Sequence, residues 1–328
     1  MLYHGGRVIA ASLQYGIPAV EWLDLSTGIN PRGWPVPSLS SACWQRLPEE
    51  DDGLEAAAAQ YYGSPRLLPV PGSQAAIQTL PGLFPRAGVA VMGPLYNEHP
   101  QAWAKAGHEV QRVAYADLAQ ALVAETPVIV LCNPNNPTGE SHPRAAILAA
   151  ARELAGRGGW LLVDEAFADP LPADSVAALA GSPEAPNLIV LRSPGKFFGL
   201  AGARVGFVFA APEILARLRE IIGPWAVAGP SREVTKQALT DRRWQSDTRE
   251  TLLAEGRRLR ALLAPLGQVA GTPLFATVTT DRAHALVKHF AERAILVRHY
   301  DPQPLVRFGL PANETDWQRL EAAISAWR

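Results

Sequence analysis

Five short runs of almost uninterrupted apolar residues constrain the fold of this chain more than any other feature of its sequence. They are 88–92 (GVAVM), 127–132 (PVIVLC), 160–164 (WLLVD), 188–192 (LIVLR) and 205–210 (VGFVFA). Strands without polar–apolar alternation are typical of parallel sheets that helices cover on both faces. Between the second and third runs, 144–154 (RAAILAAAREL) has the apolar spacing of a helix, and glycines follow it. This repeated order predicts an α/β domain with a mainly parallel sheet.

The pattern changes after about residue 223. A long charged stretch with helical spacing comes first, and shorter strand-like and helix-like segments follow it. We expect helices at 244–263, 283–293 and 315–327, and strands at 274–279, 295–298 and 305–308. This mixture predicts a smaller α+β domain. We therefore divide the chain into an N-terminal arm (1–40) that contributes to the small domain and the active site, a large domain (41–223) and a small C-terminal domain (224–328).

The composition excludes several classes of protein. The 328 residues have a formal net charge of −1, so no overall field attracts nucleic acid or an anionic membrane. The two cysteines, Cys43 and Cys132, make no disulfide framework, and no Cys/His spacing indicates a metal. The chain has neither a signal-peptide pattern nor an apolar run long enough to span a bilayer. We expect a cytoplasmic protein that binds neither nucleic acid nor membranes.

A lysine in apolar surroundings is the first candidate for chemistry. Lys196 follows the buried run 188–192 and has Phe, Leu, Ala and Gly as its neighbours. Such lysines are often simply solvated, but an apolar pocket disfavours the ammonium, and the neutral amine forms Schiff bases. Arg204 stands eight residues later, and with Ser193 it could hold a phosphate.

Polar residues also follow two other buried runs. The segment 133–139 (NPNNPTG) comes after 127–132, and Asp164 ends 160–164. The first has the composition of a turn, and a carboxylate at the second could cap a helix, bind a metal or stabilise a cationic ring nitrogen. However, the carboxyl ends of parallel strands are where α/β sheets bind ligands. Both segments are therefore candidates for a ligand site.

In order and spacing, these elements resemble the class I and II aminotransferase-like family of enzymes that use pyridoxal 5'-phosphate (PLP), over nearly the whole chain. The resemblance implies that Lys196 carries PLP as a Schiff base and that Asp164 pairs with the pyridine nitrogen. It makes Asn136 a hydrogen-bond donor to the ring's 3-oxygen and places the aromatic ring of Tyr96 on the cofactor. The implied phosphate ligands are Gly72, Ser73, Gln74, Ser193 and Arg204.

The resemblance extends to the substrate and to assembly. Arg307 matches the arginine that holds the substrate carboxylate, although on its own it could be a surface strand residue. The family also implies a homodimer. Three positions depart from the common pattern. Phe167 replaces a tyrosine that donates to the 3-oxygen, Gly195 replaces the Ser or Thr often found just before the lysine, and Leu47 replaces a tyrosine that reaches the neighbouring subunit's site.

Within the family, the start of the chain is most similar to the branch that decarboxylates L-threonine O-3-phosphate in cobalamin synthesis. His4, Gly5 and Gly6 resemble its His-Gly-Gly signature, and 24–33 (DLSTGINPRG), which contains Asn30, resembles the stretch that follows. Arg298 is a candidate second anion ligand, for the substrate phosphate. The alternatives are an aminotransferase acting on histidinol phosphate or a related substrate, and a ligand-sensing DNA-binding regulator, for which the chain shows no helix-turn-helix segment.

Overall fold

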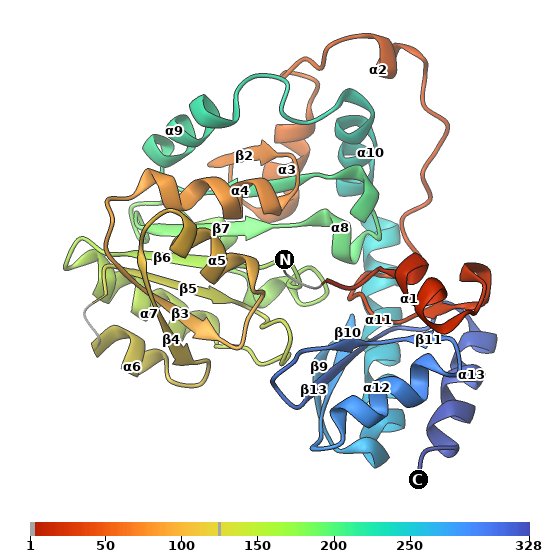
Figure 1. Cartoon of the computed structure of the whole chain (residues 1–328). Coiled ribbons are helices and arrows are strands. Elements are labelled where there is room, and N and C mark those ends of the chain that lie inside the picture. Colours follow the sequence, from red (N-terminus) through yellow and green to blue (C-terminus); the bar gives the residue numbers. More distant parts are fainter. Residues whose placement is uncertain (1–3, 124–125) are drawn as a thin grey trace. The chain divides into compact units, whose positions relative to one another are not determined.

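The computed structural model describes residues 4–123 and 126–328, and the chain forms two compact units (Figure 1). The central unit comprises Trp34–Asn136 and Ser141–Ser246. The terminal unit comprises Met1–Gly33, Pro137–Glu140 and Asp247–Arg328. Residues 1–3 of the predicted arm lie outside the described residues. None of the described helices combines the length and apolar character that crossing a membrane requires.

A seven-stranded sheet forms the core of the central unit. Its order is β2-β8-β7-β6-β5-β3-β4. The neighbours from β7 to β4 are parallel, whereas β8 is antiparallel to both β7 and β2. The predicted α/β fold with a mainly parallel sheet is confirmed. The strands are β2 (Leu67–Val70), β3 (Gly88–Gly93), β4 (Glu109–Ala114), β5 (Val128–Cys132), β6 (Trp160–Asp164), β7 (Leu188–Arg192) and β8 (Gly206–Phe209).

Helices cover both faces of this sheet. Connections between parallel strands are right-handed. A helix therefore lies on one face of the sheet when its connection leads in one direction across the sheet, and on the other face when the connection leads back. Accordingly α4 and α5 pack together, as do α6 and α7 (Figure 1). The helices of this unit are α2 (Ala42–Gln45), α3 (Leu54–Tyr62), α4 (Ser73–Thr79), α5 (Glu98–Lys105), α6 (Leu118–Val123), α7 (Arg144–Ala155), α8 (Pro194–Phe197), α9 (Pro212–Ile222) and α10 (Gly229–Thr240).

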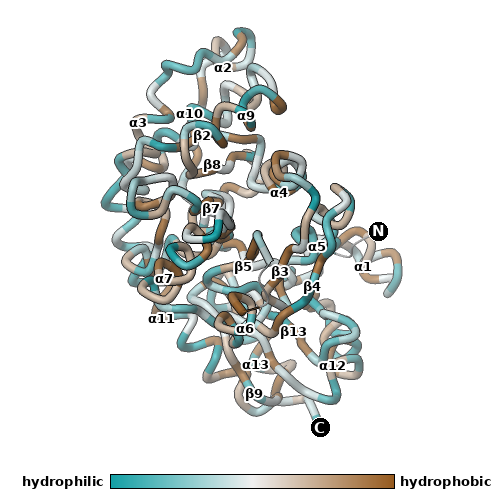
Figure 2. Tube along the Cα trace, turned by 90° about the vertical axis from the view of Figure 1, so that its left-hand side faces the viewer, coloured by the Kyte–Doolittle hydropathy of each residue, from teal (hydrophilic) through white to brown (hydrophobic). Residues whose placement is uncertain are grey.

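Burial follows the position of each strand in the sheet. Every residue of β5, β7 and β8 is buried, which explains their continuous apolar sequences. In Figure 2 the hydrophobic colour gathers along β5 and β3. The edge strand β4, by contrast, buries none of its six residues. Its sequence EVQRVA therefore lacks the apolar run by which the five predicted strands were recognised, and it was not predicted.

The terminal unit contains a four-stranded antiparallel sheet of order β12-β13-β10-β9 and a two-stranded parallel pair, β1-β11. The four-stranded sheet and its helices match the α+β mixture predicted after residue 223. The elements are α1 (Val8–Tyr15), β1 (Leu23–Asp24), the part of α11 (Arg242–Leu263) from Asp247 on, β9 (Gln268–Thr272), β10 (Phe275–Thr279), α12 (Ala283–Ala291), β11 (Ile295–Leu296), β12 (Arg298–His299), β13 (Leu305–Gly309) and α13 (Glu314–Ser325).

The single strand predicted at 295–298 is divided. Its first half, β11, pairs with β1, and its second half, β12, pairs with β13. The pairing with β1 depends on the N-terminal segment, where Leu25 is buried and its backbone N–H donates to Leu296. A local apolar pattern cannot indicate which of two distant partners each half of a strand will meet.

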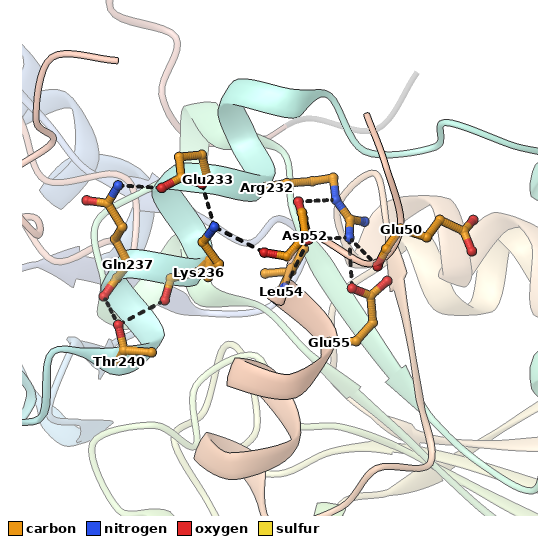
Figure 3. A network of polar contacts seen from close by, with 9 residues as sticks. All are labelled: Glu50, Asp52, Leu54, Glu55, Arg232, Glu233, Lys236, Gln237 and Thr240. Carbon is orange, nitrogen blue, oxygen red and sulfur yellow. Dashed lines mark hydrogen bonds and ion pairs between the residues drawn. The ribbon is translucent and has the colours of Figure 1, made fainter. Parts of the chain in front are cut away.

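The compact units also divide the chain elsewhere than at the predicted boundaries of 40 and 223. Helix α10, which we placed in the small domain, packs against α3 in the central unit. Figure 3 shows the reason: the buried Arg232 of α10 donates to both carboxylate oxygens of Asp52 and to Glu55. Burial would raise the pKa of Asp52, but the hydrogen bonds from Arg232 and from the backbone of Leu54, together with the charges of Arg232 and Lys236, lower it.

Candidate active site

A cavity in the central unit, with an empty volume of about 640 Å³, is the candidate active site. All nine residues predicted to carry or contact the cofactor line it. Three further residues, Cys132, Ala166 and Phe167, complete the lining. The twelve are Gly72, Ser73, Gln74, Tyr96, Cys132, Asn136, Asp164, Ala166, Phe167, Ser193, Lys196 and Arg204.

The sheet topology explains how residues more than a hundred positions apart meet. Strands β5, β6 and β7 are parallel, so the residues that end or follow them (Cys132, Asp164 and Ser193) lie at one edge of the sheet. Strand β8 runs the opposite way, and for that reason the residue just before it, Arg204, reaches the same edge. The antiparallel pairing of β2 with β8 brings the start of α4 there as well.

Asp164 is held by two hydrogen bonds at the buried end of β6. Its Oδ1 accepts from the backbone N–H of Ala166 at 3.0 Å, and its Oδ2 lies 2.8 Å from Nε2 of His99, which is itself buried. Both contacts suit an ionised carboxylate, which can only accept hydrogen bonds. His99 was missed by the sequence analysis. Its signal is position: it stands three residues after Tyr96, in the first turn of α5.

Buried aromatic rings fix the helix that carries Lys196. Phe197 and Phe198 are fully buried, and both pack against Trp244 with ring centroids 5.5 Å apart. Nζ of Lys196 lies 5.7 Å from the centre of the Phe167 ring. The amine therefore stands at the cavity beside one aromatic ring, whereas most of the other lining residues are polar.

Arg204 and Gly72 are in close contact. Arg204 has a φ of 51°, which is uncommon for a residue with a side chain. Gly72 has a φ of 75°, and a Cβ added to it would lie 2.9 Å from the Arg204 guanidinium. Similarly, a Cβ at Gly206 would lie 2.4 Å from the backbone nitrogen of Ser73. Only glycine permits this approach of α4 to β8, which sets a guanidinium beside the start of a helix.

Two side chains of the lining are joined by a polar network. The Tyr96 hydroxyl donates to Oε1 of Gln74 at 3.1 Å, and Nε2 of Gln74 donates to Glu98 at 2.8 Å. The first bond links the two predicted cofactor residues, and Glu98 fixes Gln74 from the other side. Glu98 was not predicted as a site residue.

A buried ion cluster holds the ends of β6 and β7 next to the cavity. Arg192 donates to Glu165 at 2.6 Å and to Asp169 at 2.7 Å, and all three side chains are buried. Burial alone would lower the pKa of Arg192, but the charges of Asp169 and Glu165 raise it, so the guanidinium stays charged. Glu165 follows Asp164 and Arg192 precedes Ser193. The cluster therefore ties together the two segments that carry these lining residues.

The six residues predicted to bind substrate belong to the terminal unit, and three of them lie at Ser26. The backbone N–H of Gly6 donates to Oγ of Ser26 at 2.7 Å, and Arg307 donates to its carbonyl at 2.9 Å. A Cβ on Gly5 would lie 2.3 Å from the same carbonyl. Arg298 pairs with Arg307 across β12 and β13, and both guanidinium groups lie within 6 Å of the Tyr300 ring.

The two remaining predicted substrate residues have less defined roles. His4 is half-buried at the start of the described chain. Asn30 is buried, and its Oδ1 accepts a hydrogen bond from the backbone N–H of Arg32 at 3.0 Å. This contact is typical of a residue that stabilises a turn.

Comparison with known proteins identifies the class of protein to which this fold and this cavity belong. The chain belongs to the family aminotransferase class I and II, whose model matches residues 47–325. It is similar to a threonine-phosphate decarboxylase of Pseudomonas aeruginosa, with 47% identity across all of this chain and 98% of that protein. A threonine-phosphate decarboxylase of Sinorhizobium sp. is 42% identical over 99% of this chain and 98% of its own length.

Solved structures agree on the fold. The structure of histidinol-phosphate aminotransferase from Sinorhizobium meliloti in complex with pyridoxal-5'-phosphate has a TM-score of 0.85 with this chain. The two are 23% identical, over 98% of this chain and 94% of the other. At that identity the likeness establishes the architecture and not the reaction.

Proposed function

We propose that this enzyme uses PLP to decarboxylate L-threonine O-3-phosphate, which yields (R)-1-amino-2-propanol O-2-phosphate. The observation that carries the proposal is the full-length similarity to two proteins named threonine-phosphate decarboxylase. The cavity supports it, because its lining supplies the amine, the carboxylate and the cationic group that PLP chemistry requires.

The lining fits the cofactor group by group. Arg204 and Ser193 are suited to bind a phosphate, and the close approach of Gly72 to Arg204 leaves the backbone at the start of α4 accessible beside the guanidinium. Asp164 is suited to pair with a protonated ring nitrogen, since its other contacts are all donors. Tyr96 and Asn136 lie in the same lining, where we infer contacts to the ring and its 3-oxygen.

When bound, PLP accepts the electrons of the bond that breaks at the substrate Cα. In our proposal Asp164 keeps its negative charge beside the ring nitrogen and thereby favours this withdrawal of electrons. His99 holds the Asp164 carboxylate in place from the opposite side. Lys196 would hold the cofactor through its amine, and the same amine could give or take a proton at the substrate Cα.

In this proposal, two predicted arginines and His4 bind the substrate's two anions. Arg307 would bind the carboxylate, and Arg298 with His4 would bind the phosphate. Arg298 and Arg307 are both buried, which strengthens their attraction for an anion relative to that of exposed arginines. Holding both anions fixes which Cα bond stands perpendicular to the cofactor ring, and this orientation separates decarboxylation from transamination.

The first experiment tests the reaction itself. Purified enzyme with PLP is incubated with L-threonine O-3-phosphate, and carbon dioxide is measured without any keto acid. The proposal requires carbon dioxide release in equimolar amounts with aminopropanol phosphate. The aminotransferase alternative requires turnover of histidinol phosphate with 2-oxoglutarate and no carbon dioxide from phosphothreonine. That second pair of results would overturn the decarboxylase assignment and leave the PLP assignment intact.

We further propose that the enzyme is cytoplasmic, that it serves cobalamin biosynthesis and that it forms a homodimer. An exposed apolar surface supports the dimer. Trp44, Leu47, Ile221 and Trp225 of the central unit are each more than half exposed. Trp225 lines a surface groove together with Pro48, which follows Leu47 in the sequence, and Ile222, which follows Ile221. Exposed apolar groups of this size are typical of protein interfaces.

Sedimentation velocity tests the dimer. The wild type should sediment as a dimer, and Trp225→Asp should shift it toward monomer, because it replaces an exposed apolar side chain of the groove with a charge. Val20→Asp is the matched control, since Val20 is exposed but lies in the terminal unit, outside this surface. A wild-type monomer at micromolar concentration, or an equal effect of both variants, would contradict the proposal.

A further inference from the structure

Three side chains with metal-binding atoms gather on the surface of the terminal unit. His284 lies in α12, His299 ends β12, and Asp301 follows in the next turn. Each offers one ligand atom, and these atoms all lie within 4.8 Å of one another. None of the three lines the candidate active site. The sequence analysis did not anticipate them, because the first stands fifteen residues before the second and no motif joins them.

The distance between His284 and Asp301 favours a shared ion over a direct bond. Nε2 of His284 lies 3.4 Å from Oδ1 of Asp301, and good N–H···O bonds span about 2.7–3.2 Å. Two ligands of a tetrahedral ion with bonds of about 2.0–2.1 Å stand roughly 3.4 Å apart. The pair is thus already spaced as two ligands of one ion.

The third ligand, His299, is near enough to join them. Its ring centroid lies 4.4 Å from that of His284, with the rings close to perpendicular. The side chains of His284 and Asp301 are 78% and 66% exposed. The ligand atoms of all three side chains lie within 4.8 Å of one another.

The charges around the site suit a cation-binding imidazole. Burial and the neighbouring His284 lower the pKa of His299, and Arg298 also acts in that direction. The charge of Asp301 acts in the opposite direction on this pKa. Asp301 supplies the negative charge that offsets Arg298.

We propose that His284, His299 and Asp301 form a binding site for a divalent transition-metal ion, with water in the remaining position. Two imidazoles and one carboxylate suit Zn²⁺, whereas Mg²⁺ and Ca²⁺ prefer oxygen ligands throughout. The proposal is independent of the decarboxylase assignment, since none of its residues contributes to that chemistry.

The site can be tested by isothermal titration calorimetry, in which Zn²⁺ is titrated into the full-length enzyme with PLP bound. We expect one site per chain in the wild type and an affinity at least about 10-fold weaker in His284→Gln and in Asp301→Asn. His289→Gln is the matched control, because it removes a histidine from the same helix outside the cluster. Co²⁺ should give the intense visible bands of a four-coordinate site, and His284→Gln should abolish them.

Two results would overturn the proposal. One is Zn²⁺ binding that His284→Gln, an exposed substitution that leaves the fold intact, does not weaken. The other is binding that Cys132→Ser removes. That loss would place the ion at the buried set of His99, Cys132 and Asp164, the second group of possible ligands among the described residues. Mg²⁺ at the same concentration should give no heat at the Zn²⁺ site.

Discussion

At the scale of single residues, the chemistry depends on a lysine amine that stands beside the ring of Phe167. Borohydride should fix the cofactor on one peptide only, the one that contains Lys196. Lys196→Ala should lose this adduct and at least about 10³-fold of turnover, because both cofactor attachment and proton transfer fail. Mass spectrometry of the reduced peptides gives the position, and an adduct on Lys105, Lys236 or Lys288 would refute the assignment.

A second prediction at this scale concerns Asp164 and its neighbour His99. Asp164→Ala should still bind PLP but lose at least about 100-fold in kcat, whereas Asp164→Glu should keep part of the activity. His99→Leu should retain more activity than Asp164→Ala, since the carboxylate remains. It should still lower the free energy of unfolding by about 1–3 kcal/mol, because a buried acceptor loses its partner.

Steady-state kinetics and urea unfolding of the three variants provide the measurements. Full activity in both Asp164 variants would remove this carboxylate from the mechanism. Wild-type stability in His99→Leu would show that the His99 contact contributes nothing to the fold.

At the scale of elements, the ends of β6 and β7 are joined by the buried ions of Arg192, Glu165 and Asp169. Arg192→Met should cost about 3–5 kcal/mol of unfolding free energy, because it leaves two carboxylates buried without their cation. Arg219→Met is the control. Its pair with Glu50 has the same 2.6 Å distance but is more than half exposed, and its loss should cost less than about 1 kcal/mol.

Urea unfolding followed by circular dichroism compares the two variants. Since Asp164 ends β6 and Ser193 directly follows β7, Arg192→Met should in addition release PLP faster than Arg219→Met does. If the two variants had equal free energies of unfolding, the buried cluster would stabilise the protein no more than an ion pair on the surface does.

At the scale of the whole molecule, carboxylates in both units make stability fall in acid. For Asp52, burial is outweighed by the hydrogen bonds from Arg232 and the Leu54 backbone and by the charges of Arg232 and Lys236, so its pKa is lowered. Hydrogen bonds from Lys236 and Arg258 lower the pKa values of Glu233 and Glu314. A group whose pKa is lowered by folding stabilises the protein above its unfolded pKa and loses that contribution as the pH falls through its folded pKa.

The unfolding temperature should therefore fall below about pH 4, near the unfolded pKa values of Asp and Glu. Differential scanning calorimetry from pH 3 to 7 measures this. Arg232→Gln should be less stable at neutral pH and should lose less on acidification, since Asp52 no longer gains from ionising beside a guanidinium. An acid profile parallel to that of the wild type would contradict the role of this network (Figure 3).

The sequence by itself determined the central strands and the family of the protein. Buried parallel strands have continuous apolar sequences, and the residues that follow these strands occur in the same order as in the family. The strands and the family can therefore both be inferred without knowledge of long-range contacts. All nine residues nominated for the cofactor line one cavity for the same reason. The exposed edge strand β4 left no such run and was missed.

Only the tertiary structure decided which distant side chains meet. It brought His99 to Asp164, Arg192 to Glu165 and Asp169, and His284 to His299 and Asp301. It also places α10 in the central unit, where Arg232 donates a hydrogen bond to Asp52. The segments that contain these residues have no distinctive sequence pattern. The spacing of residues along the chain therefore does not predict these contacts. They arise from strand order and helix packing, which local sequence patterns constrain only weakly.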